Sequence, residues 1–438
     1  MTDLMQLFVL EEAQEQNGRR EGALFILAAA FVLINALGLS LSATGALSWQ
    51  HMWAVALWLG LMTLAHLLLH RYKPHRDPYI FPLFALLTGW GLVLIDRLAV
   101  NFLGRQVIWL VISTAVLLVV AILPKNLRLL RRYRYTWLIA GLLLLAATLV
   151  FGVNPSGYGA ALWLPVPFVG QVYFQPSELL KLLLIVFLAS YFEEREGLLR
   201  ASSSRGLRGS LPYLAPLLLM WGFCIILLVW QRDLGAATLF FVVFLSLLYL
   251  ATGDRRYVLI GMGLMMLAAI FAYFAFQDLV ALRIDAWWNP WPDATDRAFQ
   301  IVQSLYALAA GGVLGQGVGQ GAPYYIPVVH SDFVFAAIAE EWGLVGSMGV
   351  VICFLLLAYR GLKVALLAQR PFDRYLAAGV TLLFTAQTLL IMGGVTKLLP
   401  LTGVTLPFVS YGGSSLVLSS LMLGLLLLLS GRVNDPAA

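Results

Sequence analysis

The residues Leu234–Thr252, LGAATLFFVVFLSLLYLAT, decide the fold class, because this run of nineteen residues contains no charged side chain. About 20 mostly apolar residues in an α-helix are enough to cross the hydrocarbon core of a bilayer. A strand of a membrane β-barrel would instead alternate apolar and polar positions, and this run does not alternate. The sequence therefore predicts a transmembrane helix here.

The composition of the whole chain agrees with a membrane protein. Of its 438 residues, 61% are hydrophobic and 11% are charged, whereas a soluble domain carries about 25% charged residues. The chain cannot cover a water-facing surface, which excludes a disordered protein, a secreted disulfide scaffold and an ordinary cytosolic enzyme. Its two cysteines, Cys224 and Cys353, lie in apolar runs and lack the spacing of a disulfide framework or a metal site.

Further apolar runs of similar length predict an all-α polytopic membrane protein with about twelve transmembrane helices. The expected spans are 22–43, 51–70, 79–98, 105–124, 136–153, 177–193, 212–230, 234–252, 257–277, 333–358, 374–395 and 410–430. Residues 1–21 lack the basic flank and the cleavage site of a secretory signal. The first span is therefore expected to stay in the protein.

The positions of Lys and Arg predict the orientation of these spans. If the N-terminus is cytoplasmic, 21 of the 28 basic residues fall in inside segments and Lys181 lies within a span. Six fall in outside segments or at their edges, namely Arg97, Arg105, Arg232, Arg283, Arg297 and Lys397. The positive-inside rule then places both termini in the cytoplasm and the loops 154–176 and 278–332 on the outer face. Because the basic residues lie in short loops between spans, they do not indicate nucleic-acid binding.

Ionisable residues at membrane depth cost about 2.5–3.5 kcal/mol each on insertion scales, so each requires an explanation. Glu178 and Lys181 lie three residues apart at the start of the sixth span, where they can pair on one helix face. Two interpretations remain open. The residues either cap and neutralise a helix end, or they line a water-accessible cavity.

Arg232 and Asp233 lie between two closely spaced spans. Asp233 is well placed to cap the helix that follows. Capping leaves Arg232 unexplained, so the pair slightly favours a role in forming a cavity over a purely structural one.

The expected outer loop 278–332 contains a tryptophan-rich segment, Ala286–Asp293 (AWWNPWPD), that is typical of a membrane interface. Residues 299–310, which include Gln303 and Ser304, predict a short amphipathic helix. The glycines that follow do not indicate a nucleotide-binding loop, because the Gly-Lys-Ser/Thr ending is missing.

The same loop ends with His330 and Asp332, and the span that follows contains Glu340 and Glu341. An Asp at the start of a helix is most often a cap. Glu340 lies eight residues further on, or about 12 Å along a helix. Two acidic positions in one span, with a His beside the first, exceed what capping requires.

A last polar segment begins at Lys397 and includes Ser410 and Tyr411. Its prolines, glycines and serines predict irregular backbone, which is tolerated at membrane depth only where protein or a wet cavity surrounds it. A helix broken around a cavity fits this segment better than a simple connecting loop.

Taken together and in this order, the motifs resemble the SEDS proteins (shape, elongation, division and sporulation), a family that includes RodA, FtsW and SpoVE. The matching motifs are Gln175–Glu178 with Lys181, Gln231 with Asp233–Gly235, Gln303–Leu305, His330–Phe333 with Glu340 and Glu341, and Pro400–Gly403 with Pro407–Ser415. The resemblance covers about residues 79–431, the ten-helix core of the family. It makes 1–78 a cytoplasmic N-terminus with two extra transmembrane helices and 432–438 a short cytoplasmic tail.

The resemblance implies a peptidoglycan glycosyltransferase that polymerises lipid II at the outer face of the bacterial cytoplasmic membrane, for cell elongation, division or sporulation. It also implies a partner, a class B penicillin-binding protein that supplies the transpeptidase. The family's proposed catalytic Asp falls on Asp332. The residues implied to bind substrate or to form the cavity are Trp163, Glu178, Lys181, Arg232, Asp233, Gln303, Ser304, His330, Glu340, Lys397, Ser410 and Tyr411.

Some positions depart from the family pattern. Leu162 stands where an Arg commonly precedes the Trp, Arg232 replaces a usual Pro, and Val329 replaces a common Glu. These differences concern contacts to substrate phosphates more than they concern the family assignment.

The implied chemistry needs a base and a cation for the leaving pyrophosphate. Asp332 is the candidate general base, and the candidate cations are Lys181, Arg232, Arg283, Arg297 and Lys397. A divalent cation such as Mg²⁺ or Mn²⁺ would serve the same purpose, although no ligand motif for it is present. Two other functions remain open, namely a lipid II flippase or transporter and a non-catalytic scaffold of the cell-wall synthesis complex.

Overall fold

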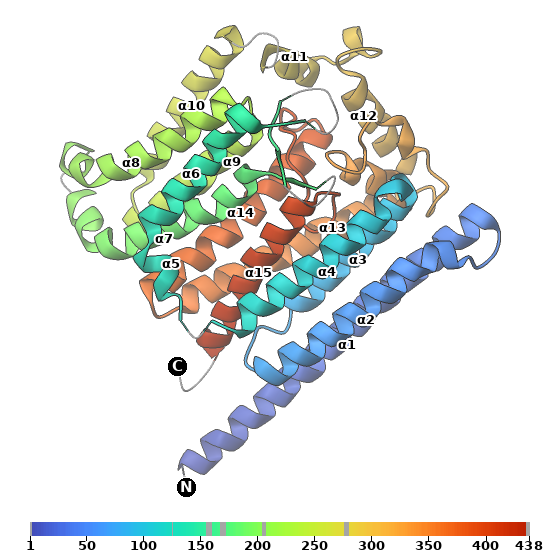
Figure 1. Ribbon diagram of the computed structural model, residues 1–438, viewed down its shortest axis with the longest axis horizontal. Coiled ribbons are helices and arrows are strands. Elements are labelled where there is room, and N and C mark those ends of the chain that lie inside the picture. Colours follow the sequence, from blue (N-terminus) through green and yellow to red (C-terminus); the bar gives the residue numbers. More distant parts are fainter. Residues whose placement is uncertain are drawn as a thin grey trace. The chain divides into compact units, whose positions relative to one another are not determined.

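The computed structural model is mainly helical and describes residues 2–124, 126–154, 160–166, 172–203, 207–275 and 280–434 (Figure 1). The long helices are α1 (Thr2–Thr44), α2 (Trp49–Tyr72), α3 (Ile80–Leu98), α4 (Val100–Ile122), α6 (Arg134–Phe151), α7 (Pro176–Ser203), α8 (Leu207–Trp230), α9 (Leu234–Thr252), α10 (Arg255–Ala275), α13 (Val334–Leu367), α14 (Pro371–Val395) and α15 (Gly413–Asn434). Shorter elements are α5 (Arg128–Arg132), α11 (Leu282–Trp288), η2 (Trp291–Asp293), α12 (Phe299–Gly311), η3 (Pro323–Tyr325), β1 (Leu164–Pro165) and β2 (Tyr173–Phe174).

Eleven helices within the described residues are long and apolar enough to cross a membrane. Together they confirm the all-α polytopic fold class. The remaining expected span, 177–193, forms the first part of α7, which is not among the eleven and carries Glu178, Lys181 and Glu193 in its first eighteen residues. Parts of the loop 154–176, the end of the span 257–277 and most of the tail 432–438 lie outside the described residues.

Several boundaries differ from the expected ones. The N-terminal helix begins at Thr2, so the acidic residues ahead of the first span continue the same helix. Only Ala99 separates α3 from α4, so α4 begins before Arg105, the first residue of the span expected at 105–124. The amphipathic helix expected at 299–310 is confirmed as α12, and the helical path stops between Val395 and Gly413, where the broken segment was expected.

The chain forms two compact units. The first comprises residues 1–125, 306–368 and 405–438, so it contains α1 to α4, α13 and α15. Small residues allow its helices to approach closely. A Cβ at Gly424 of α15 would lie 2.8 Å from the Leu117 carbonyl of α4, and a Cβ at Gly89 of α3 would lie 2.6 Å from Val32 of α1.

Buried polar contacts attach the two N-terminal helices to the rest of this first unit. His51 of α2 lies 2.8 Å from Asp96 of α3. Glu21 of α1 accepts hydrogen bonds from Arg76 and contacts His66 of α2. Such pairs are costly to break in a low-dielectric interior, so they fix the positions of α1 and α2.

The second unit comprises residues 126–305 and 369–404, and α7 lies at its centre. Helices α6, α8, α9 and α14 all pack on α7. Leu180–Phe192 of α7 are buried throughout, which matches their near-continuous apolar sequence. Gly379 of α14 allows contact with Ile185, because a Cβ there would lie 2.6 Å from that side chain.

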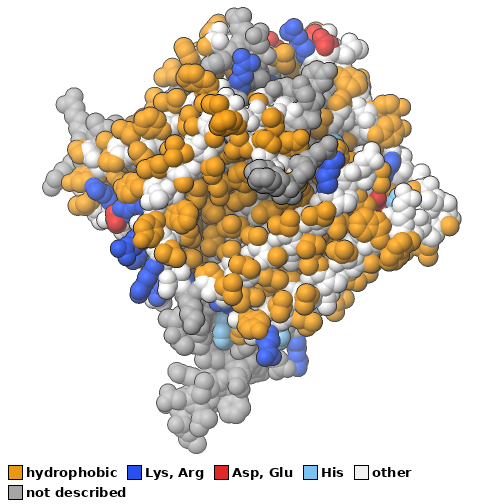
Figure 2. Space-filling view, viewed as in Figure 1, with side chains coloured by type: hydrophobic (Ala, Val, Ile, Leu, Met, Phe, Trp, Pro, Cys, Tyr) orange, Lys and Arg blue, Asp and Glu red, His pale blue; other side chains and the backbone are white. Residues whose placement is uncertain are grey.

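Exposed apolar side chains show which surfaces face lipid. In α10, only 6% of the most apolar 18-residue stretch is buried. Its side chains Leu259, Met266 and Phe271 are each more than 60% exposed. Figure 2 shows apolar side chains over most of the visible face, with Lys and Arg gathered in a few clusters. A soluble protein rarely exposes apolar patches of this size.

Candidate functional site

Glu178 and Lys181 form a buried ion pair in the second unit. Lys181 Nζ lies 2.8 Å from Glu178 Oε1 and also donates to Gln387 Oε1 of α14 at 3.2 Å. The Lys181 and Glu178 residues are 3% and 6% exposed. The other Glu178 oxygen, Oε2, is buried and accepts no hydrogen bond from any described residue. The pairing expected from the three-residue spacing is present, and the pair points into the helix bundle of this unit.

Asp233 caps α9 and belongs to the same polar group. Its side chain accepts a hydrogen bond from the Ala236 amide at 3.1 Å. Burial raises the pKa of the Asp233 carboxyl above its usual value, while the Ala236 amide, the charge of Lys181 and a hydrogen bond from Ser177 oppose this rise. Asp233 therefore caps α9 and lies close enough to Lys181 for their charges to interact.

Arg232 and Lys397 share an unusual backbone conformation. Their φ angles are 62° and 59°, in the left-handed region that non-glycine residues seldom adopt. The turn at Arg232 packs closely on the segment after Lys397. A Cβ added at Gly235 would lie only 2.3 Å from the Thr402 carbonyl oxygen. Such strain costs about 1–3 kcal/mol and gathers at functional sites. Arg232 is exposed, so its charge is accessible.

Other predicted residues of the second unit have mainly structural contacts. Ser304 is fully buried and its hydroxyl donates to the carbonyls of Ile301 and Val395 at 2.7 and 3.2 Å. Gln303 is half-buried on α12. Trp163 forms an isolated antiparallel bridge with Val153. The Lys397 carbonyl accepts a hydrogen bond from the Trp287 indole at 3.1 Å.

In the first unit, two segments far apart in sequence hold Asp332 in place. The Ser410 hydroxyl donates to the Ser331 carbonyl at 2.6 Å, and the Tyr411 amide donates to the His330 carbonyl at 2.9 Å. The Ser331 hydroxyl in turn donates to Asp332 Oδ1 at 2.8 Å. The structure thus brings His330, Asp332, Ser410 and Tyr411 together. The N-cap position of α13 is held by Phe333 and not by Asp332.

Aromatic side chains enclose one side of this turn. The rings of His330 and Tyr411 both pack on Phe102 of α4, with centroids 5.2 and 4.8 Å from it. Burial lowers the pKa of the His330 imidazole from its usual value of 6.5. Burial also raises the pKa of the Tyr411 hydroxyl, although the charge of Arg105 opposes this. Near pH 7 both groups are therefore neutral beside Asp332.

Glu340 and its neighbour Glu341 contact the glycine-rich segment that precedes His330. Glu340 accepts a hydrogen bond from the Ala322 amide at 2.7 Å, and Glu341 accepts bonds from the Gly319 amide at 3.0 Å and Arg97 Nε at 3.1 Å. Both carboxylates are buried. They hold the glycine-rich turn that precedes His330, and α13 bends one turn later at Gly343, where φ is 65°.

Two contributing residues, Gln387 and Arg97, were not among the residues expected at the site. Gln387 is 1% exposed and binds Lys181, and Arg97 binds Glu341. Gln387 is an amide within an apolar span, so the cost of burying it was a usable signal. Among the described residues, no group of three or more His, Cys, Asp and Glu side chains is arranged to hold a metal ion.

Comparison with known proteins decides the family. Residues 80–434 match the model of the FtsW/RodA/SpoVE cell cycle proteins. The chain belongs to the FtsW/RodA/SpoVE family. The match begins one residue after the start expected for the family core, and it leaves α1 and α2 outside.

Relatives within the FtsW/RodA/SpoVE family support this assignment. The chain is 36% identical to the peptidoglycan glycosyltransferase RodA of Mycobacterium tuberculosis over 386 residues, which cover 85% of this chain and 81% of that protein. It is 38% identical to the probable peptidoglycan glycosyltransferase FtsW of Geobacter sulfurreducens over 335 residues, covering 76% of this chain and 86% of that protein. It is therefore similar to both named branches.

Solved structures with 28–29% sequence identity share the fold. One chain of a peptidoglycan synthase complex, from a study of how polymerisation and crosslinking are coordinated, superposes with a TM-score of 0.68 and 29% identity, covering 82% of this chain and 98% of that one. The rod shape determining protein RodA of Thermus thermophilus superposes with a TM-score of 0.58 and 28% identity, covering 81% and 96%. The chain whose fold is described above is therefore a multi-pass membrane protein.

Proposed function

We propose that the chain is a peptidoglycan glycosyltransferase that polymerises lipid II at the outer face of the bacterial cytoplasmic membrane, with Asp332 as the general base. The observation that carries this proposal is the Asp332 turn, which Ser410 and Tyr411 hold through hydrogen bonds in a chain of the FtsW/RodA/SpoVE family. A residue that acts as a base must be held in one position, since small displacements reduce catalysis strongly.

The reaction joins two sugars by displacement. The acceptor hydroxyl oxygen attacks the anomeric carbon of the donor, whose bond to the lipid pyrophosphate breaks, and the pyrophosphate leaves with the bonding electrons. Asp332 takes the proton of the attacking hydroxyl. A well-placed general base typically contributes about 10²–10⁴-fold to the rate. Burial favours the neutral form of His330, so this neighbour adds no positive charge that would lower the basicity of the Asp332 carboxylate.

The leaving pyrophosphate needs positive charge near it. Of the candidate cations in the second unit, Arg232 is the first to test by substitution, because its side chain is exposed while Lys181 already binds Glu178 and Gln387. Strained backbone conformations gather at functional sites, and both Arg232 and Lys397 adopt one. A divalent ion bound to the pyrophosphate would add to this charge.

The test is polymerisation of labelled lipid II by the purified protein in complex with a class B penicillin-binding protein whose transpeptidase is inactivated. Asp332→Asn keeps the shape and the acceptor atom for the Ser331 hydroxyl but removes the base. We expect normal folding and a loss of about 10²-fold or more in polymerisation rate. Asp296→Asn, an exposed carboxylate of the expected outer loop, is the matched control and should keep near wild-type activity.

Other outcomes would point to other functions. Near wild-type polymerisation by Asp332→Asn would contradict the general-base assignment. Absence of polymerisation by the wild-type complex, together with lipid II movement across vesicles, would favour a flippase. Treatment with EDTA followed by addition of Mg²⁺ or Mn²⁺ measures how much a divalent ion contributes.

A further inference from the structure

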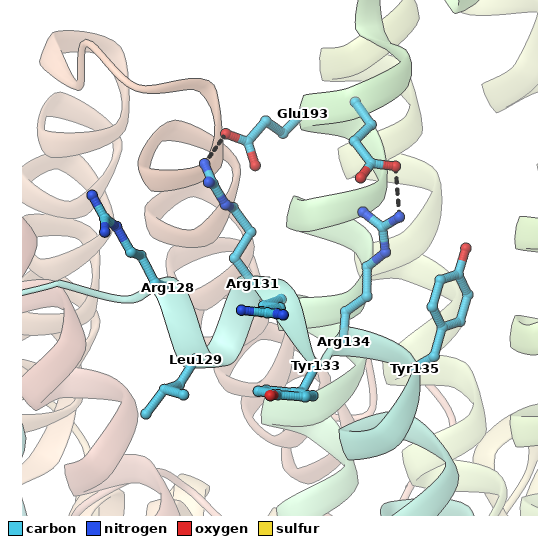
Figure 3. A pocket seen from close by; sticks show the side chains of 9 residues that line it. Arg128, Leu129, Arg131, Tyr133, Arg134, Tyr135 and Glu193 are labelled. Carbon is cyan, nitrogen blue, oxygen red and sulfur yellow. Dashed lines mark hydrogen bonds and ion pairs between the residues drawn. The ribbon is translucent and has the colours of Figure 1, made fainter.

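A basic pocket lies in the second unit, and none of its lining residues belongs to the candidate site described above. It encloses about 740 Å³ and is lined by Arg128, Leu129, Arg131, Arg132, Tyr133, Arg134, Tyr135, Glu193 and Glu194. The arginines come from α5 and the first residue of α6, and the two carboxylates come from α7. In Figure 3, Arg128, Arg131 and Arg134 extend to the same side of α5, whereas Leu129 points away.

The pocket wall is held in place by α7. Arg131 binds Glu193 at 2.9 Å, and Arg134 binds Glu194 at 2.5 Å. Arg134 also donates to the carbonyl and hydroxyl of Ser190, both at 3.1 Å, and the Ser190 hydroxyl donates to the Arg131 carbonyl at 3.2 Å. Ser190 is fully buried. These contacts fix the positions of Arg131 and Arg134, so the pocket wall forms without a ligand.

The charges in this pocket are not balanced. Four arginines face two glutamates, and the glutamates are taken by Arg131 and Arg134. Arg128 and Arg132 are exposed, and within the described part of the chain neither pairs with a carboxylate, so they contribute two uncompensated positive charges. A ligand with two negative charges would complete the site.

The surroundings favour a lipid over a soluble anion. Helix α6 starts at Arg134, and its side chains Ile139, Leu143 and Val150 are 49%, 66% and 76% exposed, as on a lipid-facing surface. Tyr133, Tyr135 and Trp137 at its start are each at least 40% exposed, which is typical of the headgroup level. A headgroup in the pocket would place its acyl chains along this apolar face.

We propose that this pocket, formed by α5, the start of α6 and α7, binds the headgroup of an anionic phospholipid that carries two phosphates, of the diphosphatidylglycerol class. Basic pockets between transmembrane helices on the cytoplasmic side are known sites for such headgroups, and the distribution of basic residues in the sequence predicts this side for α5. The site does not depend on the glycosyltransferase reaction.

The experiment measures lipid bound to the purified full-length protein by native mass spectrometry and by the shift in Tm. The probes are diphosphatidylglycerol, phosphatidylglycerol, phosphatidylcholine and inorganic pyrophosphate. We expect the first lipid to bind tightest, phosphatidylcholine to bind weakest, and added salt to weaken the binding. Inorganic pyrophosphate should neither bind at similar concentration nor displace the lipid.

Variants connect this binding to the pocket. Arg128→Gln with Arg132→Gln removes the two uncompensated charges from exposed positions, so folding should be unaffected and lipid affinity should fall about 30-fold. Arg255→Gln with Arg256→Gln, an exposed pair at the start of α10, is the matched control and should change affinity by less than about twofold.

Three results would overturn the proposal. They are equal binding of phosphatidylcholine and diphosphatidylglycerol, an equal loss of affinity in both double variants, and displacement of the lipid by inorganic pyrophosphate, which would identify a soluble anion as the ligand.

Discussion

At the residue scale, His330 connects the electrostatics of the candidate site to folding. Burial lowers the pKa of its imidazole from the usual 6.5, so the folded protein prefers the neutral ring. In the unfolded chain, the ring takes up a proton below about pH 6.5. The contribution of His330 to stability is therefore full above pH 6.5 and is lost as the pH falls through this value toward the folded pKa.

His330→Phe tests this relation, because it keeps a ring on Phe102 and removes the titration. We expect the Tm of the wild type to fall more steeply between pH 7 and pH 5 than the Tm of the variant. The comparison of slopes cancels other titrating groups. Parallel slopes would show that His330 titrates in the folded protein as it does in the unfolded chain.

The Glu178–Lys181 pair gives a second prediction at this scale. Removing one partner leaves a buried charge without its counter-ion, which costs about 3–5 kcal/mol. We therefore expect Glu178→Gln and Lys181→Met each to destabilise the protein more than the double variant does. The measurement is a double-mutant cycle on the free energy of unfolding in detergent.

A matched control for this cycle lies on the same helix. Glu196 and Arg200 form an ion pair at 2.7 Å in which the Arg200 side chain is 54% exposed. Exposed pairs contribute about 0–1 kcal/mol, so the same cycle there should show weak coupling. Additive effects at Glu178 and Lys181 would contradict the direct interaction of their charges.

At the scale of elements, close helix contacts depend on glycines. Helices α4 and α15 of the first unit meet at Gly424, where an added Cβ would lie 2.8 Å from the Leu117 carbonyl. Gly424→Ala should therefore push the two helices apart and cost about 1–3 kcal/mol of stability. A Cβ at Gly431 of the same helix would meet no atom within 4 Å. Gly431→Ala is the control and should be neutral or slightly stabilising; equal losses in both variants would contradict the packing argument.

The division of the chain into a family core and an N-terminal addition is a prediction at the scale of the whole molecule. The family match starts at residue 80, and α1 and α2 pack on α3. We expect a chain lacking residues 1–76 to fold and to polymerise lipid II. It should be less stable, because Asp96 loses its partner His51 and α3 loses the helices α1 and α2 that pack on it.

Activity and stability of the truncated chain are measured separately. Full-length His51→Phe is the matched comparison, since it removes the partner of Asp96 without deleting the helices. If the truncated protein folds but forms no glycan strands under conditions in which the full chain does, α1 and α2 belong to the working enzyme.

The sequence by itself determined the fold class, the helix positions and the motifs that identify the family. A helix in lipid forms its backbone hydrogen bonds within its own segment and needs enough apolar residues to cross the bilayer. About 20 consecutive residues are therefore enough to predict a span. The run Leu234–Thr252 therefore appears as α9 with unchanged bounds. The i,i+3 pairing of Glu178 and Lys181 was predictable for the same reason, because one helix fixes their separation.

Only the tertiary structure decided which distant residues meet. The Asp332 turn is held by Ser410 and Tyr411, nearly 80 positions away along the chain. Lys181 binds Gln387, which lies more than 200 residues further along the chain. Hydropathy gives the length of each helix but not its neighbours, since lipid-facing and protein-facing apolar residues look alike in the sequence. The contact of Glu340 with the glycine-rich turn could therefore not be predicted from the sequence, because it depends on how α13 and that turn pack together.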